Sequence, residues 1–161
     1  MADAIRARDL SKVAMEAVRL QNGYALAIDA RDWDYFRTLF TPDVQAHYPH
    51  SSFDGVDDWL GNFIPLHDEY AWSLHVITNH VTREDANGIW AACYGWVQWT
   101  EKDKPGHMNK AEVLFRDRLS DDGGTWRIAR RRLALLSSRH QVPIPDGLTL
   151  PHSVLDLADW A

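Results

Sequence analysis

The chain lacks several features that mark special classes of protein. Among its 161 residues there is one cysteine, Cys93, so an internal disulfide and a cysteine-based zinc site are excluded. Positive charge is not in excess: 17 lysines and arginines against 23 aspartates and glutamates give a net charge of −6, which argues against nucleic acid and anionic membranes as partners. Charged residues recur through the first thirty positions, so we expect no signal peptide, no membrane span and a cytoplasmic location.

Cofactor and metal motifs are also missing. The sequence has no glycine-rich phosphate loop and no Gly-x-Ser-x-Gly motif. His47 and His50 flank a proline, and His80 lies five residues after His75, which on a regular strand points the two imidazoles to opposite faces. None of these pairs offers two imidazoles to one ion. We therefore expect neither a cofactor nor a metal.

Apolar residues are present at the level of a globular protein. Hydrophobic residues make up 45% and charged residues 25%, and the length suits one domain spanning residues 1–161. Eight tryptophans are more than a core of this size needs. Several of them should therefore line something other than a packed core.

The first part of the chain has a helical period. Apolar residues recur every three to four positions over residues 10–31, which predicts an amphipathic helix. A short helix is predicted over 33–39, a strand over 44–48, a turn over 51–55 and a third helix over 56–66.

After residue 70 the spacing of apolar residues changes from three or four positions to two. It predicts strands over 72–82, 89–100, 110–119 and 126–136, joined by tight turns. Helices followed by antiparallel strands indicate an α+β fold. We expect a strongly curved mixed or antiparallel sheet, wrapped as a cone-shaped barrel around the N-terminal helices, with an internal pocket. The proline-containing tail, residues 142–161, ends in apolar residues, so we expect it to dock as a lid or on a neighbouring subunit.

Four segments carry a family resemblance: residues 24–34, 39–44, 75–80 and 124–128. Together they resemble the nuclear transport factor 2-like superfamily, in its SnoaL-like and scytalone dehydratase branch, over about residues 10–138. This resemblance implies the fold just described. It leaves activity open, because the fold hosts dehydratases, isomerases, cyclases, hydrolases and binding proteins.

The resemblance also implies roles for three residues. Asp29 and His75 match the catalytic aspartate and histidine of scytalone dehydratase, and Tyr48 matches one of two tyrosines that polarise the substrate carbonyl. The chain departs from that pattern at three positions, where it has Ile28, Gln98 and Glu112.

The strand over 89–100 offers two faces. One carries Tyr94, Trp96 and Gln98, which fill the core or line the pocket, and we assign them to substrate binding together with Glu112 on the next strand and Tyr24. The other carries Ala91, Cys93, Val97 and Trp99, an apolar surface on which we expect a homodimer or higher oligomer.

Two classes of function remain. The first is a cofactor-independent lyase or isomerase, dehydratase- or cyclase-like, acting by acid–base proton transfer on a small hydrophobic cyclic, polyketide-, terpenoid- or steroid-like compound. The second is a non-catalytic small-ligand-binding or assembly module on the same fold. An Asp29 carboxylate within about 3 Å of a His75 nitrogen in an open pocket would favour the enzyme.

Overall fold

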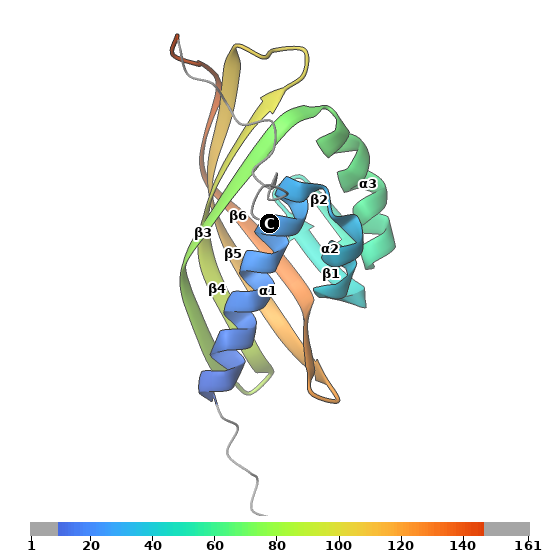
Figure 1. The fold of residues 1–161 in the computed structure, drawn as a ribbon. Helices are drawn as coiled ribbons and strands as arrows, with labels where there is room; N and C mark the ends of the chain where they lie inside the picture. The colour runs from blue at the N-terminus through green and yellow to red at the C-terminus, as the bar shows by residue number, and fades with distance from the viewer. Residues whose placement is uncertain (1–9, 147–161) are drawn as a thin grey trace, which may run out of the picture.

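The computed structural model describes residues 10–146, which form three helices and six strands (Figure 1). Helix α1 spans Leu10–Ala30, α2 spans Trp33–Thr38 and α3 spans Val56–Asp68. The predicted helices are confirmed, because their apolar faces are the buried ones. In α1, for example, Val13, Ala17, Leu20, Tyr24 and Ile28 are all buried.

The strands form one six-stranded mixed sheet in the order β2-β1-β6-β5-β4-β3. Their bounds are β1 Phe40–Tyr48, β2 Ser51–Asp54, β3 Tyr70–Asp85, β4 Gly88–Glu101, β5 His107–Asp122 and β6 Thr125–Pro143. Among the strand pairings of residues 10–146, only that of β1 with β6 is parallel. The helices lie against the same side of the long strands in Figure 1, so the expected α+β class is confirmed.

Several predicted boundaries are wrong; β1, for example, begins at Phe40 rather than at residue 44. Residues 51–54, predicted as part of a turn, form β2, because they pair antiparallel with β1. Strand β6 continues beyond residue 136 to Pro143, since Val142 and Pro143 still pair with the first residues of β5. Pro143 is tolerated because it ends the strand. Of the expected C-terminal lid, residues 147–161 lie outside the described residues.

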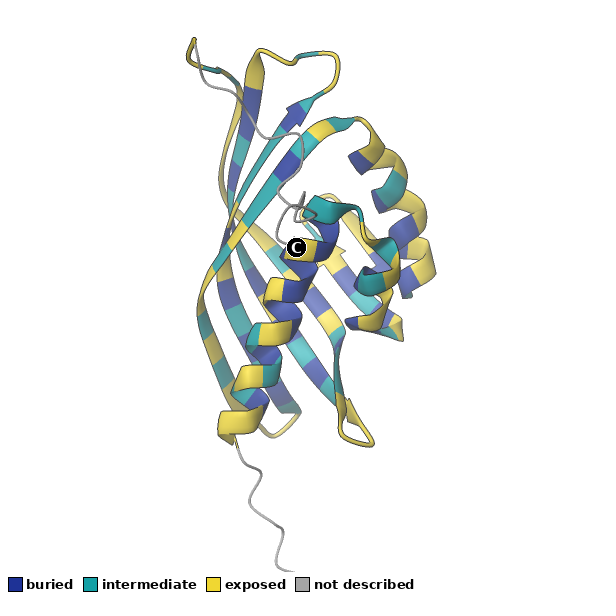
Figure 2. Cartoon of the chain, in the orientation of Figure 1, coloured by how far each residue is buried: buried dark blue, intermediate teal, exposed yellow. Residues whose placement is uncertain are grey.

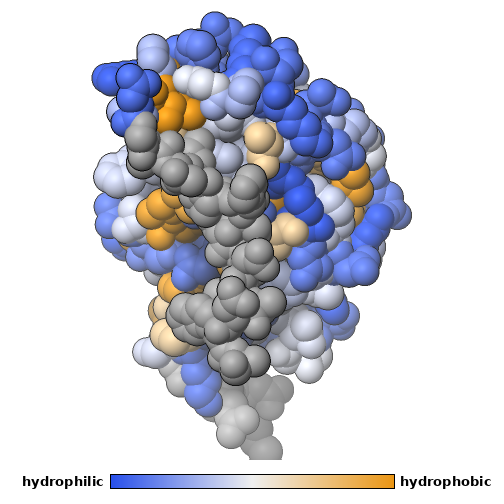
Figure 3. Space-filling model, turned by 45° about the horizontal axis from the view of Figure 1, so that its top comes forward, coloured by the Kyte–Doolittle hydropathy of each residue, from blue (hydrophilic) through white to orange (hydrophobic). Residues whose placement is uncertain are grey.

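The core lies between the helices and the sheet. Figure 2 shows buried and exposed residues alternating along the strands and a buried side on α1. Trp59 and Phe36 are completely buried at its centre, and the rings of Phe40 and Tyr24 pack against them at tilted angles. On the face in Figure 3 most of the surface is hydrophilic, and the hydrophobic residues form small separate groups.

The structure reverses the expected faces of β4. Ala91 and Cys93 are buried in the core, whereas Tyr94 and Trp96 are 44% and 60% exposed on the outer side. Gly95 belongs to the inner face, where an added Cβ would lie 2.8 Å from Phe115. The expected oligomer surface of Ala91, Cys93, Val97 and Trp99 is therefore wrong, because Ala91 and Cys93 belong to the core and the other two pack against it.

A bulge in β3 corrects a second face assignment. The pairing with β4 shifts between Thr78 and Val81, and Asn79 has a positive φ of 56°. An extra residue at this point reverses the alternation. His75 and His80 therefore both reach α1, where they contact Asp29 and Gln21.

Candidate active site

The site begins at the C-terminal end of α1. Arg31 adopts a left-handed conformation with φ of 59°, and its backbone N–H donates to the Ile28 carbonyl (3.0 Å) while that of Asp32 donates to Ala27 (2.9 Å). This pattern is a Schellman cap, in which glycine is the usual residue. The cap ends the helix directly after the turn that carries Asp29, whose carboxylate faces β3.

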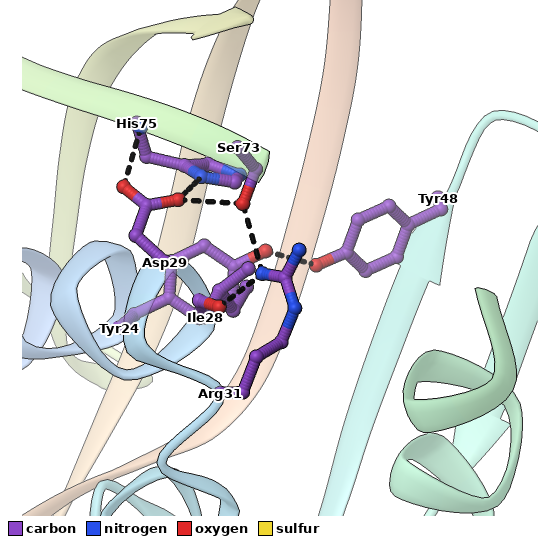
Figure 4. A network of polar contacts seen from close by, with 7 residues as sticks. All are labelled: Tyr24, Ile28, Asp29, Arg31, Tyr48, Ser73 and His75. Atoms are coloured by element: carbon purple, nitrogen blue, oxygen red, sulfur yellow. Dashed lines mark hydrogen bonds and ion pairs between the residues drawn. The ribbon is translucent and has the colours of Figure 1, made fainter. Parts of the chain in front are cut away.

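The carboxylate of Asp29 is held by three donors from β3 (Figure 4). Its Oδ2 accepts from the backbone N–H of His75 at 2.7 Å. Its Oδ1 accepts from Nδ1 of His75 at 2.7 Å and from the Ser73 hydroxyl at 2.9 Å. Only 4% of the Asp29 side chain and 7% of the His75 side chain are exposed. Since a carboxylate accepts, a proton of the His75 ring lies on Nδ1, and when the ring carries that proton alone, Nε2 has a free lone pair.

Arg31 offsets the unfavourable position of this carboxylate. A negative charge at a helix C-terminus opposes the helix dipole. The Arg31 guanidinium donates to the Ser73 hydroxyl (2.9 Å) and to the Ile28 carbonyl (2.5 Å). Burial lowers the pKa of Arg31, and the nearby Asp29 raises it. The result is a chain of donors, Arg31 to Ser73 to Asp29, that fixes the carboxylate.

Two tyrosines form a second polar group beside the first. The hydroxyls of Tyr24 and Tyr48 are 2.9 Å apart, and the ring of Tyr24 meets the His75 ring edge-on at 6.1 Å between centroids. Burial raises the pKa of Tyr24 and raises that of Tyr48 well above the ordinary value, so both phenols keep their protons. Whichever hydroxyl donates to the other, one proton remains for a ligand.

These groups line a cavity of about 380 Å³ between α3 and the inner face of the sheet. Its size is within the usual range for small-molecule sites. The polar part of its wall includes Tyr24, Tyr48, His50, His67, Ser73 and His75. The apolar part includes Phe63, Val97, Trp99, Val113, Phe115 and Leu133. Trp99 is thus one of the tryptophans that line a cavity rather than a core.

The structure does not bring the other expected site residues to this cavity. Tyr94 and Trp96 point outward, and Gln98, two residues further on the same face, lies opposite Leu74 of β3. Glu112 lies beside Trp96 on the neighbouring strand and accepts a hydrogen bond from Ser137. Their expected place at the cavity wall is wrong, because the register opposes His75 to Val97 and so gives the cavity the odd-numbered residues of β4.

Several cavity residues were not predicted, and His67 is the one with the most strongly altered environment. It lies in the last turn of α3, and its Nδ1 is 2.7 Å from the Phe63 carbonyl four residues earlier. Rings of Trp33, Phe63 and Tyr70 surround it. Burial lowers its pKa to about 4. The helical spacing of His67 from Phe63 was visible in the sequence, but the neighbours that desolvate it come from other elements.

Buried charge behind the cavity is paired. Arg131 and Asp117 form a bidentate ion pair at 2.7 and 2.8 Å, and Gln21 donates to the same carboxylate at 3.0 Å. The guanidinium of Arg131 lies 4.1 Å from the centroid of the Tyr24 ring. Among residues 10–146 no cluster of three or more histidine, cysteine or acidic side chains is placed to hold a metal ion. Cys93 is buried, and burial raises its pKa to about 12.

Both the sequence and the fold of this chain are similar to those of known proteins. The sequence profile of the SnoaL-like domain matches residues 14–132. No curated protein matches the chain. None of the helices within the described part of the chain is both long and apolar enough to span a membrane.

Solved structures share the fold at low sequence identity. The structure of LinA is 13% identical with a TM-score of 0.72, over 88% of this chain and 95% of that one. A proposed scytalone dehydratase from Novosphingobium aromaticivorans is 17% identical with a TM-score of 0.72, over 88% and 99%. The hexachlorocyclohexane dehydrochlorinase LinA-type3 from Novosphingobium barchaimii is 11% identical with a TM-score of 0.73, over 89% and 99%.

Proposed function

Since the chain belongs to the SnoaL-like domain family, we propose that it is a cofactor-independent lyase or isomerase that moves protons on a small, mainly apolar cyclic compound. The observation that carries the proposal is the 2.7 Å contact between Asp29 and Nδ1 of His75 at the wall of an apolar cavity. A carboxylate in this position orients the imidazole and stabilises the positive charge that the ring acquires on protonation. Polyketide-, terpenoid- and steroid-like rings suit such a cavity.

In the proposed first step, Nε2 of His75 takes a proton from a carbon next to a carbonyl group. The electron pair of the broken C–H bond moves toward the carbonyl oxygen, which becomes negative. The Tyr48 hydroxyl, paired with Tyr24, donates to that oxygen. A preorganised donor of this kind lowers the barrier by roughly 3 kcal/mol.

In the second step the electron pair moves back from the oxygen toward carbon. The substrate then either loses a leaving group or takes a proton at another carbon. In an elimination, the bond to a β-hydroxyl breaks, a C=C bond forms, and the imidazolium gives its proton to the leaving oxygen to release water. In an isomerisation, the same proton goes to another carbon. Elimination is favoured, because the names of the similar structures, a dehydrochlorinase and a proposed dehydratase, both denote eliminations.

A panel of bicyclic β-hydroxyketones and β-chloroketones tests the proposal. The conjugated product is followed by ultraviolet absorbance, and exchange of the α-protons in D₂O by NMR. We expect wild-type protein to accelerate one or both reactions and His75→Ala to abolish the acceleration. The control is His80→Ala, which removes another partly buried imidazole of β3.

Tyr48→Phe should keep the fold and slow the same reactions by about two orders of magnitude, because the oxyanion loses its donor. Tyr94→Phe, on the outer face, is the matched control and should have no effect. If compounds of the panel bind but none of them undergoes exchange or elimination, the protein is instead a binding module.

A further inference from the structure

His67 lines the cavity as well as a second pocket that includes Asp29, Arg31 and Asp68. Its ring offers a ligand one hydrogen-bonding group, which is an acceptor. The Phe63 carbonyl cannot donate, so the 2.7 Å contact requires the proton of the ring to lie on Nδ1. The other nitrogen, Nε2, then carries a lone pair. Within residues 10–146 the structure gives Nε2 no hydrogen-bond partner, although His67 lines the cavity and is only 6% exposed.

Two of the three imidazoles that line the cavity, those of His67 and His75, share a tautomer but differ in what holds it. Nδ1 of His75 donates to a carboxylate, which stabilises an imidazolium, whereas Nδ1 of His67 donates to a neutral carbonyl. Burial among aromatic rings and the positive charge of Arg31 disfavour a proton on His67 and lower its pKa to about 4. At neutral pH the His67 ring therefore keeps its proton on Nδ1 and takes no second proton on Nε2. It remains a neutral acceptor.

The cavity also lacks charge. Among the described residues that line it there is no aspartate, glutamate, lysine or arginine. Asp29 lies behind His75, and Arg131 is paired with Asp117. An ionised ligand would lose its hydration without gaining a counter-ion, which is strongly unfavourable.

We infer that His67 determines specificity: its Nε2 accepts a hydrogen bond from a hydroxyl group of an uncharged, ring-containing substrate. This inference rests on the proposed function and narrows it to hydroxylated neutral rings. A buried acceptor without a partner penalises a ligand that lacks the donor, because the lone pair then loses its water and gains nothing. The hydroxyl that donates to His67 is a different part of the substrate from the carbon that loses its proton to His75.

Two naphthalene derivatives of similar shape test the inference. 2-Naphthol has the hydroxyl donor, and 2-methoxynaphthalene replaces its proton by a methyl group. We expect calorimetric titration of the wild-type protein to show about tenfold tighter binding of 2-naphthol, and His67→Phe to remove that difference. His80→Phe, which changes a partly buried histidine outside the cavity wall, is the control and should keep the difference.

A measurement on the unmodified protein does not depend on the folding of a variant. In ¹⁵N NMR spectra at neutral pH, the His67 ring should carry its proton on Nδ1, and its Nε2 signal should shift with 2-naphthol but not with 2-methoxynaphthalene. A proton on Nε2 in the free protein, or a preference for 2-naphthol that survives in His67→Phe, would overturn the inference.

The test separates this inference from the proposed function. If both compounds bind equally well to wild-type protein, the cavity is a small-molecule site and only the role of His67 is wrong. If neither compound binds to the folded protein, the cavity does not take ring compounds, and both proposals fail.

Discussion

The Asp29→Asn substitution removes the charge at the centre of the proposed site while keeping its shape. Asp29 accepts through Oδ2 from the backbone N–H of His75, and through Oδ1 from the His75 ring and the Ser73 hydroxyl. Asparagine has one oxygen and one NH₂ group. The backbone N–H of His75 is always a donor, so it requires the oxygen, and the NH₂ group must face Nδ1 of the ring.

The imidazole then has to change its tautomer. Nδ1 becomes an acceptor and the proton moves to Nε2, the nitrogen left for a substrate, so the ring can no longer take a proton there. A substitution that imposes the wrong tautomer costs on the order of 10⁴ in kcat. The hydrogen bonds are largely kept, so the free energy of unfolding should fall by only about 1–2 kcal/mol.

The assay compares the rate of α-proton exchange in wild-type protein, Asp29→Asn and His75→Ala. We expect a large loss in Asp29→Asn and a still larger one in His75→Ala. The matched control is Asp34→Asn, an exposed aspartate of α2, which should leave the rate unchanged. ¹⁵N NMR reports the tautomer of His75 directly. An Asp29→Asn protein with wild-type exchange, or with the ring proton still on Nδ1, would refute the mechanism.

Three further predictions concern packing, pH and assembly. Gly95→Ala should lower the free energy of unfolding in urea by about 1–3 kcal/mol, because the new methyl group meets Phe115 at 2.8 Å, whereas Gly61→Ala, with open space around it, should not destabilise. The unfolded chain binds a proton at His67 near pH 6.5 but the folded protein only near pH 4, so acid favours unfolding. As the pH falls from 6.5 to 4, the free energy of unfolding should decrease by about 3 kcal/mol more in wild-type protein than in His67→Phe. Urea titrations at several pH values would measure this difference. Because the outer face of the sheet exposes Trp96, we expect a homo-oligomer through that face, which Trp96→Asp dissociates in analytical ultracentrifugation; a wild-type monomer at micromolar concentration would contradict this.

The local periods of the sequence determined most of the fold. The three-to-four-residue spacing of α1 and the alternation of β3 to β6 were sufficient to predict these elements, because both depend on neighbouring residues alone. The resemblance supplied Asp29 and His75, and the structure brings them into contact. Boundaries were predicted less well: β2 and the end of β6 exist only through pairing with distant strands.

Tertiary structure alone decided which residues the cavity receives. An alternating strand has two faces with the same period, and the choice between Trp96 and Trp99 depends on register and on where the helices pack. The bulge at Asn79 reverses the alternation of side chains along β3, and no pattern in the sequence predicts it. His67 acquires its role from rings contributed by α2 and β3, which desolvate it. Sequence determines local conformation, whereas burial and electrostatic environment are sums over residues far apart in the chain.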